Sequence, residues 1–157
     1  MIKVLFVCLG NICRSPTADG VMRKLVADAG LENAISIDSA GTASWHIGRA
    51  PDPRTVAAAS ARGFDLAPLR ARQVSKLDFA EFDYVLAMDN ANLAELNRLK
   101  PANYKGHLGL FLTFGEQQQF SEVPDPYHGG SEGFELVLDL VEDAANGLLN
   151  DIRKHML

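Results

Sequence analysis

The segment VCLGNICRSPT, residues 7–17, places two cysteines five positions apart in a short stretch that contains glycine and ends in Arg-Ser-Pro. A metal site, a disulfide and a catalytic nucleophile would each use cysteine. Cys8 and Cys13 have no third cysteine or nearby histidine to complete the four ligands of a structural zinc site. With only two cysteines in the chain, a disulfide scaffold is disfavoured as well. A nucleophile, or two small buried thiols, remain as interpretations.

The residues on either side of this segment predict a strand, a tight loop and a helix. Ile2–Cys8 is almost wholly apolar after Lys3, as in a strand that is covered on both faces of a parallel sheet. Ser15 is suited to cap a helix and Pro16 to occupy its first turn, and Gly30 closes the apolar pattern that follows.

The same alternation continues to the end of the chain. We expect further strands and helices over the segments 35–39, 53–62, 84–88, 92–99, 107–112 and 131–154. Strands that alternate with helices predict an open, doubly wound α/β fold, whose ligands bind at the carboxyl ends of the strands. Cys8 lies at such an end, and the long segment 115–130 has little periodic pattern, which predicts a loop.

Length and charge limit the function. The chain has 157 residues, of which 47% are apolar, so residues 1–157 are expected to form a single domain. The formal net charge of −5 disfavours binding to nucleic acid or to an anionic membrane. No apolar run is long enough for a membrane span or a signal-peptide core, and the reduced cysteines predict a cytoplasmic protein.

The loop itself suits a tetrahedral dianion. A short connection between a strand and a helix turns backbone N–H groups inward, and the helix adds its positive end. Arg14 can bind two oxygens of the anion, and the same field favours the Cys8 thiolate, which can attack phosphorus in line. Gly10 lets the backbone approach, Asn11 can adopt a left-handed conformation, and the Ser15 hydroxyl can donate to the sulfur.

These features resemble the low-molecular-weight protein tyrosine phosphatase family, whose signature is a Cys-x5-Arg-Ser loop close to the N-terminus. The resemblance extends over essentially the whole chain and includes SAGT at 39–42, ARQ at 71–73, DYVLAMD at 83–89 and VPDPY at 123–127. It implies a four-stranded parallel sheet with helices on both faces and a phosphate-binding loop after the first strand. It also implies a hydrolase that removes phosphate from phosphotyrosine through a cysteinyl-phosphate intermediate, without metal or other cofactor.

The family's partners and the rival activities follow from the same resemblance. The implied substrate is a tyrosine-phosphorylated protein, a bacterial tyrosine autokinase being one such partner, and the implied state is a monomer. Arsenate reductases share the loop but use further cysteines downstream, and this chain has none after Cys13. A module that binds phosphotyrosine without turning it over would have no use for a nucleophile and an acid.

The general acid is assigned by the resemblance and not by spacing. Asp125 in PDPY corresponds to the family's acid, which protonates the departing phenolate and later takes a proton from water. Without the family motif, an Asp-Pro dipeptide is more typical of a simple turn.

The remaining candidate residues concern substrate binding. Leu9 and Cys13 lie in the loop, and Ile12, Trp45 and Tyr127 are expected around a slot for a flat ring, although Trp45 could instead pack in the core. In the related arginine-phosphatase branch a threonine takes the place of Ile12, so isoleucine favours phosphotyrosine.

Two positions near the loop leave questions open. Many family members carry a histidine that orders the loop asparagine where this chain has Leu69, so Asn11 would be held by other groups such as Ser39 or Arg72. Cys13 could form a reversible disulfide with Cys8 or pack inertly under the loop. The four histidines are predicted to be surface or structural residues, and Asp89, at a strand end, is predicted to have a structural role.

Overall fold

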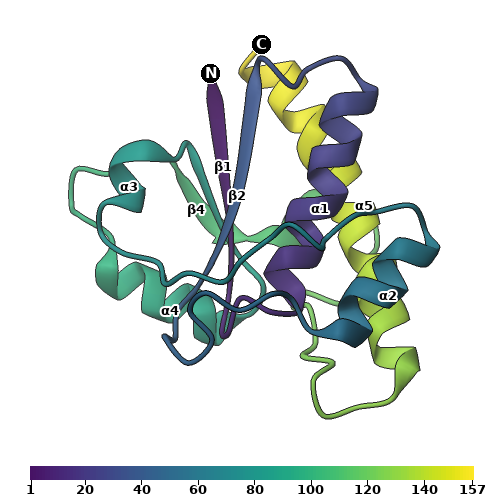
Figure 1. Cartoon of the computed structure of the whole chain (residues 1–157). Coiled ribbons are helices and arrows are strands. Elements are labelled where there is room, and N and C mark those ends of the chain that lie inside the picture. The colour runs from purple at the N-terminus through teal and green to yellow at the C-terminus, as the bar shows by residue number, and fades with distance from the viewer.

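A four-stranded, wholly parallel sheet forms the centre of the molecule, in the order β2-β1-β3-β4 (Figure 1). The computed structural model describes all residues, 1–157. The strands are β1 (Ile2–Cys8), β2 (Ile35–Gly41), β3 (Tyr84–Ala87) and β4 (His107–Leu110). The predicted α/β fold, with its parallel sheet and its loop after the first strand, is confirmed.

The helices cover both faces of this sheet. They are α1 (Arg14–Asp28), α2 (Pro53–Ala61), α3 (Asp78–Glu81), α4 (Asn90–Leu99) and α5 (Ser131–His155). In Figure 1, α1, α2 and α5 lie on one side of the strands, and α3 and α4 lie on the other. A 3-10 turn, η1 (Phe111–Phe114), follows β4.

The apolar run of β1 is explained by its two buried faces. Val4, Phe6 and Cys8 belong to the core beneath α1 and α5, whereas Leu5 and Val7 belong to the core beneath α3 and α4. All five side chains are at most 2% exposed. Because successive side chains of a strand point to opposite faces, only a strand covered on both sides needs apolar residues at every position.

Several boundaries differ from the sequence predictions for identifiable reasons. The prediction that Ser15 caps the first helix is wrong, because α1 begins at Arg14, its N-cap is Cys13, and no side chain caps it. Helix α4 begins two residues earlier than predicted, because the Asp89 carboxylate accepts a hydrogen bond from the N–H of Asn92. The short helix α3 was not predicted.

The loops that follow the strands meet at the carboxyl edge of the sheet. The N–H groups of Thr42 and Ala43, just after β2, donate to the carbonyls of Cys8 and Leu9. The N–H of Val123, within the long segment 115–130, donates to the carbonyl of Met88 after β3. This edge therefore collects four separate parts of the chain around Cys8. None of the helices has the length and apolar character that crossing a membrane requires.

Candidate active site

The backbone of the β1–α1 loop is turned so that its N–H groups face inward. The carbonyls of Cys8, Leu9 and Ile12 accept hydrogen bonds from Thr42, Ala43 and Asp52, which surround the loop. Since the N–H of a trans peptide points opposite to its carbonyl, the next N–H in each case points into the loop. The N–H of Asn11 donates to Cys8 Sγ over 3.3 Å. The loop thus forms a cradle for an anion above the sulfur.

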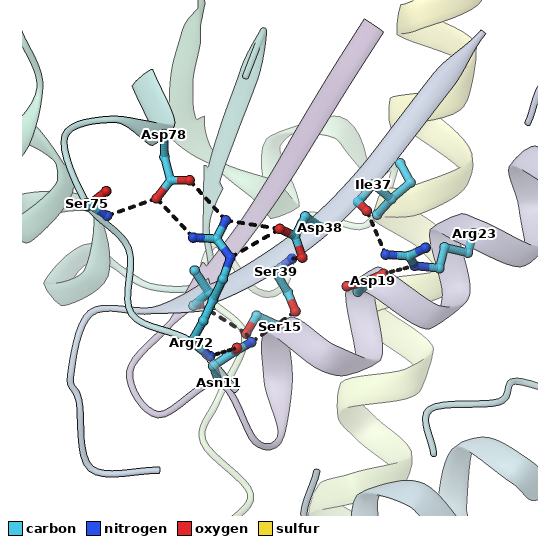
Figure 2. Close-up of polar contacts among 11 residues, drawn as sticks. Asn11, Ser15, Asp19, Arg23, Ile37, Asp38, Ser39, Arg72, Ser75 and Asp78 are labelled. Atoms are coloured by element: carbon cyan, nitrogen blue, oxygen red, sulfur yellow. Dashed lines mark hydrogen bonds and ion pairs between the residues drawn. The ribbon is translucent and has the colours of Figure 1, made fainter. Parts of the chain in front are cut away.

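Asn11 holds the loop in shape from its centre. Its φ of 58° makes it the one non-glycine residue in the left-handed region, a conformation that asparagine tolerates better than most residues. Its side chain is 2% exposed and fully engaged. The Nδ2 group donates to Ser15 Oγ over 2.8 Å and to Ser39 Oγ over 3.0 Å, and Oδ1 accepts from the N–H of Arg72 over 3.0 Å (Figure 2). Ser39 and Arg72, the two residues expected to hold Asn11, therefore both bind its side chain.

The direction of these bonds fixes the Ser15 hydroxyl. An amide nitrogen has two protons, and Asn11 Nδ2 gives one to each serine, so both hydroxyl oxygens act as acceptors toward Asn11. Ser15 then has its own proton free for another acceptor. Cys8 Sγ lies 3.0 Å from Ser15 Oγ, nearer than the carbonyl of Ala40 at 3.4 Å. The Ser15 hydroxyl is therefore a donor to the sulfur, as predicted from the sequence.

The Arg14 side chain lies buried beside the loop that surrounds Cys8. It is 5% exposed, and Nη1 pairs with Asp89 Oδ2 over 2.7 Å and donates to the carbonyl of Val123 over 3.2 Å. Burial acts to lower the pKa of Arg14, but the negative charges of Cys8, Asp89 and Asp125 outweigh it and raise the pKa above its ordinary value. The guanidinium is therefore charged, and its contacts with Asp89 and the Val123 carbonyl fix its position. Asp89 thus has the structural role predicted for it, which is to position Arg14.

Asp125 lies across from the loop, on the long segment 115–130. Its Oδ2 is 3.7 Å from Arg14 Nη2, and its Oδ1 accepts from the N–H of Tyr127 over 3.0 Å. The side chain is 47% exposed and lines the pocket above Cys8. The carboxyl thus begins a turn and also faces the site, so the two interpretations of the Asp-Pro dipeptide coexist.

A pocket of about 190 Å³ opens above the sulfur. Ile12, Trp45 and Tyr127 line it, as expected, together with Leu9, Gly10 and Cys13. The alternative in which Trp45 packs in the core is wrong, because this side chain is 68% exposed.

Two histidines that were predicted to be surface or structural residues also line this pocket. They are His46 and His128, which follow Trp45 and Tyr127 directly. Nδ1 of His46 is buried without a hydrogen-bond partner. Their position next to the two predicted aromatic residues was the signal that could have identified them.

Cys13 is buried at 5% exposure where α1 begins. Burial raises the pKa of Cys13 to about 12, and the nearby negative charge of Asp52 adds to the shift. At neutral pH Cys13 is therefore a thiol and not a thiolate. Both cysteines are free thiols in the structure. A reversible disulfide between Cys8 and Cys13 stays a prediction.

The fold and the loop define the class: an α/β protein that presents a cysteine within an anion-binding loop at the carboxyl edge of a parallel sheet. Residues 3–156 match the family model described as low molecular weight phosphotyrosine protein phosphatase.

Similar proteins agree over the full length of the chain. A low molecular weight phosphotyrosine protein phosphatase of Schizosaccharomyces pombe is 46% identical over 149 residues, which cover 94% of this chain and 95% of the relative. The crystal structure of a protein tyrosine phosphatase from Entamoeba histolytica, with Hepes in its active site, superimposes with a TM-score of 0.95 at 41% identity, covering 100% of both chains. A Drosophila arginine phosphatase superimposes with a TM-score of 0.91 at 31% identity, covering 97% of this chain and 98% of that one. The chain belongs to the low molecular weight phosphotyrosine protein phosphatase family.

Proposed function

We propose that this protein hydrolyses phosphotyrosine in proteins, and small aryl phosphates, in two steps through a phosphorylated Cys8. The observation that carries the proposal is the grouping of a buried sulfur, inward N–H groups and a charged arginine beneath a pocket that an aspartate lines. Membership of the phosphatase family supports the same reaction.

In the first step the Cys8 thiolate attacks phosphorus, and the bond between phosphorus and the tyrosine oxygen breaks. Arg14 and the backbone N–H groups of residues 9–14 bind the equatorial oxygens, whose charge grows in the transition state. Asp125 gives its proton to the departing phenolate.

In the second step water attacks the cysteinyl phosphate. Asp125, now a carboxylate, takes a proton from that water, and the phosphorus–sulfur bond breaks to release phosphate. Ser15 donates a hydrogen bond to the sulfur as it leaves, which is the role that its 3.0 Å contact with Sγ supports.

The pocket walls support an aromatic leaving group. Trp45 and Tyr127 offer flat surfaces at the mouth, and Ile12 is an apolar wall without a hydroxyl. A phosphorylated arginine is the competing substrate, because the Drosophila relative carries that name. Ile12→Thr should therefore lower the preference for phosphotyrosine over phosphoarginine, and an unchanged preference would contradict the role given to Ile12.

The first experiment measures hydrolysis of p-nitrophenyl phosphate against pH, in EDTA, for the unmutated protein, Cys8→Ser and Asp125→Asn. We expect no turnover from Cys8→Ser and a loss of roughly 10²- to 10⁴-fold from Asp125→Asn, as for a missing general acid. Turnover by Cys8→Ser would overturn the mechanism. Equal turnover by Asp125→Asn would remove Asp125 as the acid, and binding without turnover by the unmutated protein would indicate a phosphotyrosine-binding module.

The physiological setting is a further part of the proposal. We place the protein in the cytoplasm on the basis of its two reduced cysteines. The family resemblance supports a monomer, with a bacterial tyrosine autokinase as its protein substrate. Dephosphorylation of a purified, autophosphorylated tyrosine kinase by the wild type but not by Cys8→Ser would support this substrate. Failure on that kinase, with rapid hydrolysis of aryl phosphate, would reject it.

A further inference from the structure

Arg72 is held by ion pairs in an otherwise loop-like segment between α2 and α3. Its side chain reaches Asp38 Oδ2 at 3.1 Å on one side and Asp78 Oδ1 at 3.0 Å on the other (Figure 2). Asp78 is in turn fixed, because its Oδ2 accepts from the N–H of Ser75 over 2.9 Å. The Asp78 side chain is 9% exposed and the Arg72 side chain 36%, so this pair is partly sheltered from water.

The backbone of Arg72 is bound at both of its polar groups. Its carbonyl accepts from the N–H of Gly41 over 2.8 Å, which attaches the segment to the end of β2. Its N–H donates to Oδ1 of Asn11. The side-chain clamp and the bond to Gly41 together set where that N–H points.

This N–H decides the orientation of the Asn11 amide. With Oδ1 committed to Arg72, the Nδ2 protons must point to Ser15 and Ser39. If the amide turned over, its oxygen would face the serines and the Ser15 proton would be drawn away from the sulfur. Asp38 reinforces the arrangement, since its Oδ1 accepts from the N–H of Ser39 over 2.8 Å.

We infer that Arg72, clamped between Asp38 and Asp78, is a positioning residue for the nucleophile: it fixes the Asn11 amide and thereby directs the Ser15 hydroxyl to Cys8. The N–H of Arg72 is the donor to Asn11 Oδ1, so the clamp that holds Arg72 also orders Asn11. The inference deepens the proposed function and rests on it for its catalytic consequence. Its effect on the thiolate can be measured without turnover.

The test compares Arg72→Met with Arg62→Met. Arg62 is also braced by carboxylates, those of Glu135, Asp139 and Glu142, but it joins α2 to α5 away from the loop. The readouts are kcat and KM for p-nitrophenyl phosphate, and the pH midpoint for alkylation of Cys8 by iodoacetamide, followed by peptide mass spectrometry. Arg14, Asp125, His46 and His128 also face this pocket and remain unchanged in both variants.

We expect Arg72→Met to lower kcat about tenfold and to raise the alkylation midpoint by about half to one pH unit, the effect of weakening one hydrogen bond to a charged group. KM should change less than kcat. Arg72→Lys should lie between, because an ammonium can pair with Asp78 but cannot span both carboxylates as a guanidinium does. Arg62→Met should leave both readouts at their wild-type values.

A second variant separates positioning from simple charge. Asp38→Asn removes a negative charge, which by electrostatics alone would shift the alkylation midpoint down, opposite to Arg72→Met. If the clamp positions Ser15, losing it raises the alkylation midpoint of Cys8 in both Arg72→Met and Asp38→Asn. This variant also serves if Arg72→Met fails to fold, since the Asp38 side chain is 44% exposed and its amide can still accept from Ser39.

The outcomes distinguish the inference from the proposed function. Upward shifts in both Arg72→Met and Asp38→Asn support the clamp, even if the unmutated protein lacks phosphatase activity. Shifts of opposite sign, or an unchanged midpoint in a folded Arg72→Met variant, overturn the clamp while leaving the phosphatase intact.

Discussion

Gly41, the last residue of β2, packs directly against the backbone of the loop between β1 and α1. A methyl group built on its Cα would lie 2.7 Å from the Leu9 carbonyl oxygen and 3.1 Å from the Gly10 carbonyl carbon. These are backbone atoms, and the neighbouring N–H groups of Thr42 and Ala43 already hold the loop in place. The loop cannot give way here without moving the N–H groups that face the sulfur.

Gly41→Ala is therefore expected to lower kcat/KM for aryl phosphate by about 10- to 100-fold, because small displacements of a catalytic loop are costly. The control is Gly109→Ala in β4, where the added methyl group meets only the exposed His107 ring, at 3.1 Å. Steady-state kinetics and thermal unfolding of both variants provide the measurement. Full activity in a folded Gly41→Ala variant would mean that the loop can shift without loss.

At the scale of elements, α4 and the phosphate loop share one side chain. Asp89 Oδ1 accepts from the N–H of Asn92 over 2.8 Å, which caps α4, and Asp89 Oδ2 pairs with Arg14. The cap fixes the position of the carboxylate relative to the sheet. The start of a helix thus orients the arginine that is proposed to bind phosphate.

The two functions of Asp89 can be separated. Asp89→Asn retains an oxygen for the cap but loses the charge that pairs with the buried Arg14, so activity should fall about tenfold and the melting temperature should fall as well. Asp89→Ala loses the cap in addition and should lower the free energy of unfolding by about 1 kcal/mol more than Asp89→Asn does. Kinetics and urea unfolding of the pair test this. Equal stability of the two variants would show that the cap contributes nothing.

At the scale of the whole molecule, two tyrosine hydroxyls form hydrogen bonds between distant segments at the end of the sheet away from Cys8. The Tyr84 hydroxyl on β3 donates to Asp151 of α5 over 3.0 Å, and the Tyr104 hydroxyl donates to the carbonyl of Phe82 over 2.9 Å. Burial raises the pKa of both tyrosines to about 12, and Asp151 adds to the shift of Tyr84. Both phenols are therefore protonated in the folded state at pH values where an unfolded chain would begin to lose those protons.

This difference predicts a loss of stability in alkali. A group whose pKa is raised on folding contributes stability that is complete below its unfolded pKa, 10.0 for tyrosine, and is lost as pH rises through its folded value, about 12. The urea midpoint should hold steady up to about pH 9 and fall between about pH 10 and 12. Tyr84→Phe should reduce that fall, and an identical pH dependence in this variant would contradict the assignment.

The sequence was most informative where chemistry requires neighbours in the chain. Cys8, Arg14 and Ser15 are close in sequence because one loop must surround one small anion, so the roles proposed for them follow from spacing and residue type. The start of α1 was not predictable in the same way. Ser15 is a good helix cap by composition, but its hydroxyl is engaged by Asn11 and Cys8, since burial against the sulfur outweighs the local preference.

The sequence by itself determined the parallel α/β fold, through apolar strands that need cover on both faces, and the chemistry proposed for the loop, through one contiguous motif. The tertiary structure alone decided what holds that loop. The groups around Asn11 come from β2 and from the segment before α3, at Ser39 and Arg72, and the carboxylates that clamp Arg72 are at Asp38 and Asp78. Hydrogen bonds and ion pairs between distant segments depend on distances of a few ångströms, which no local periodicity encodes, and they exist only after the sheet has brought its carboxyl edge together.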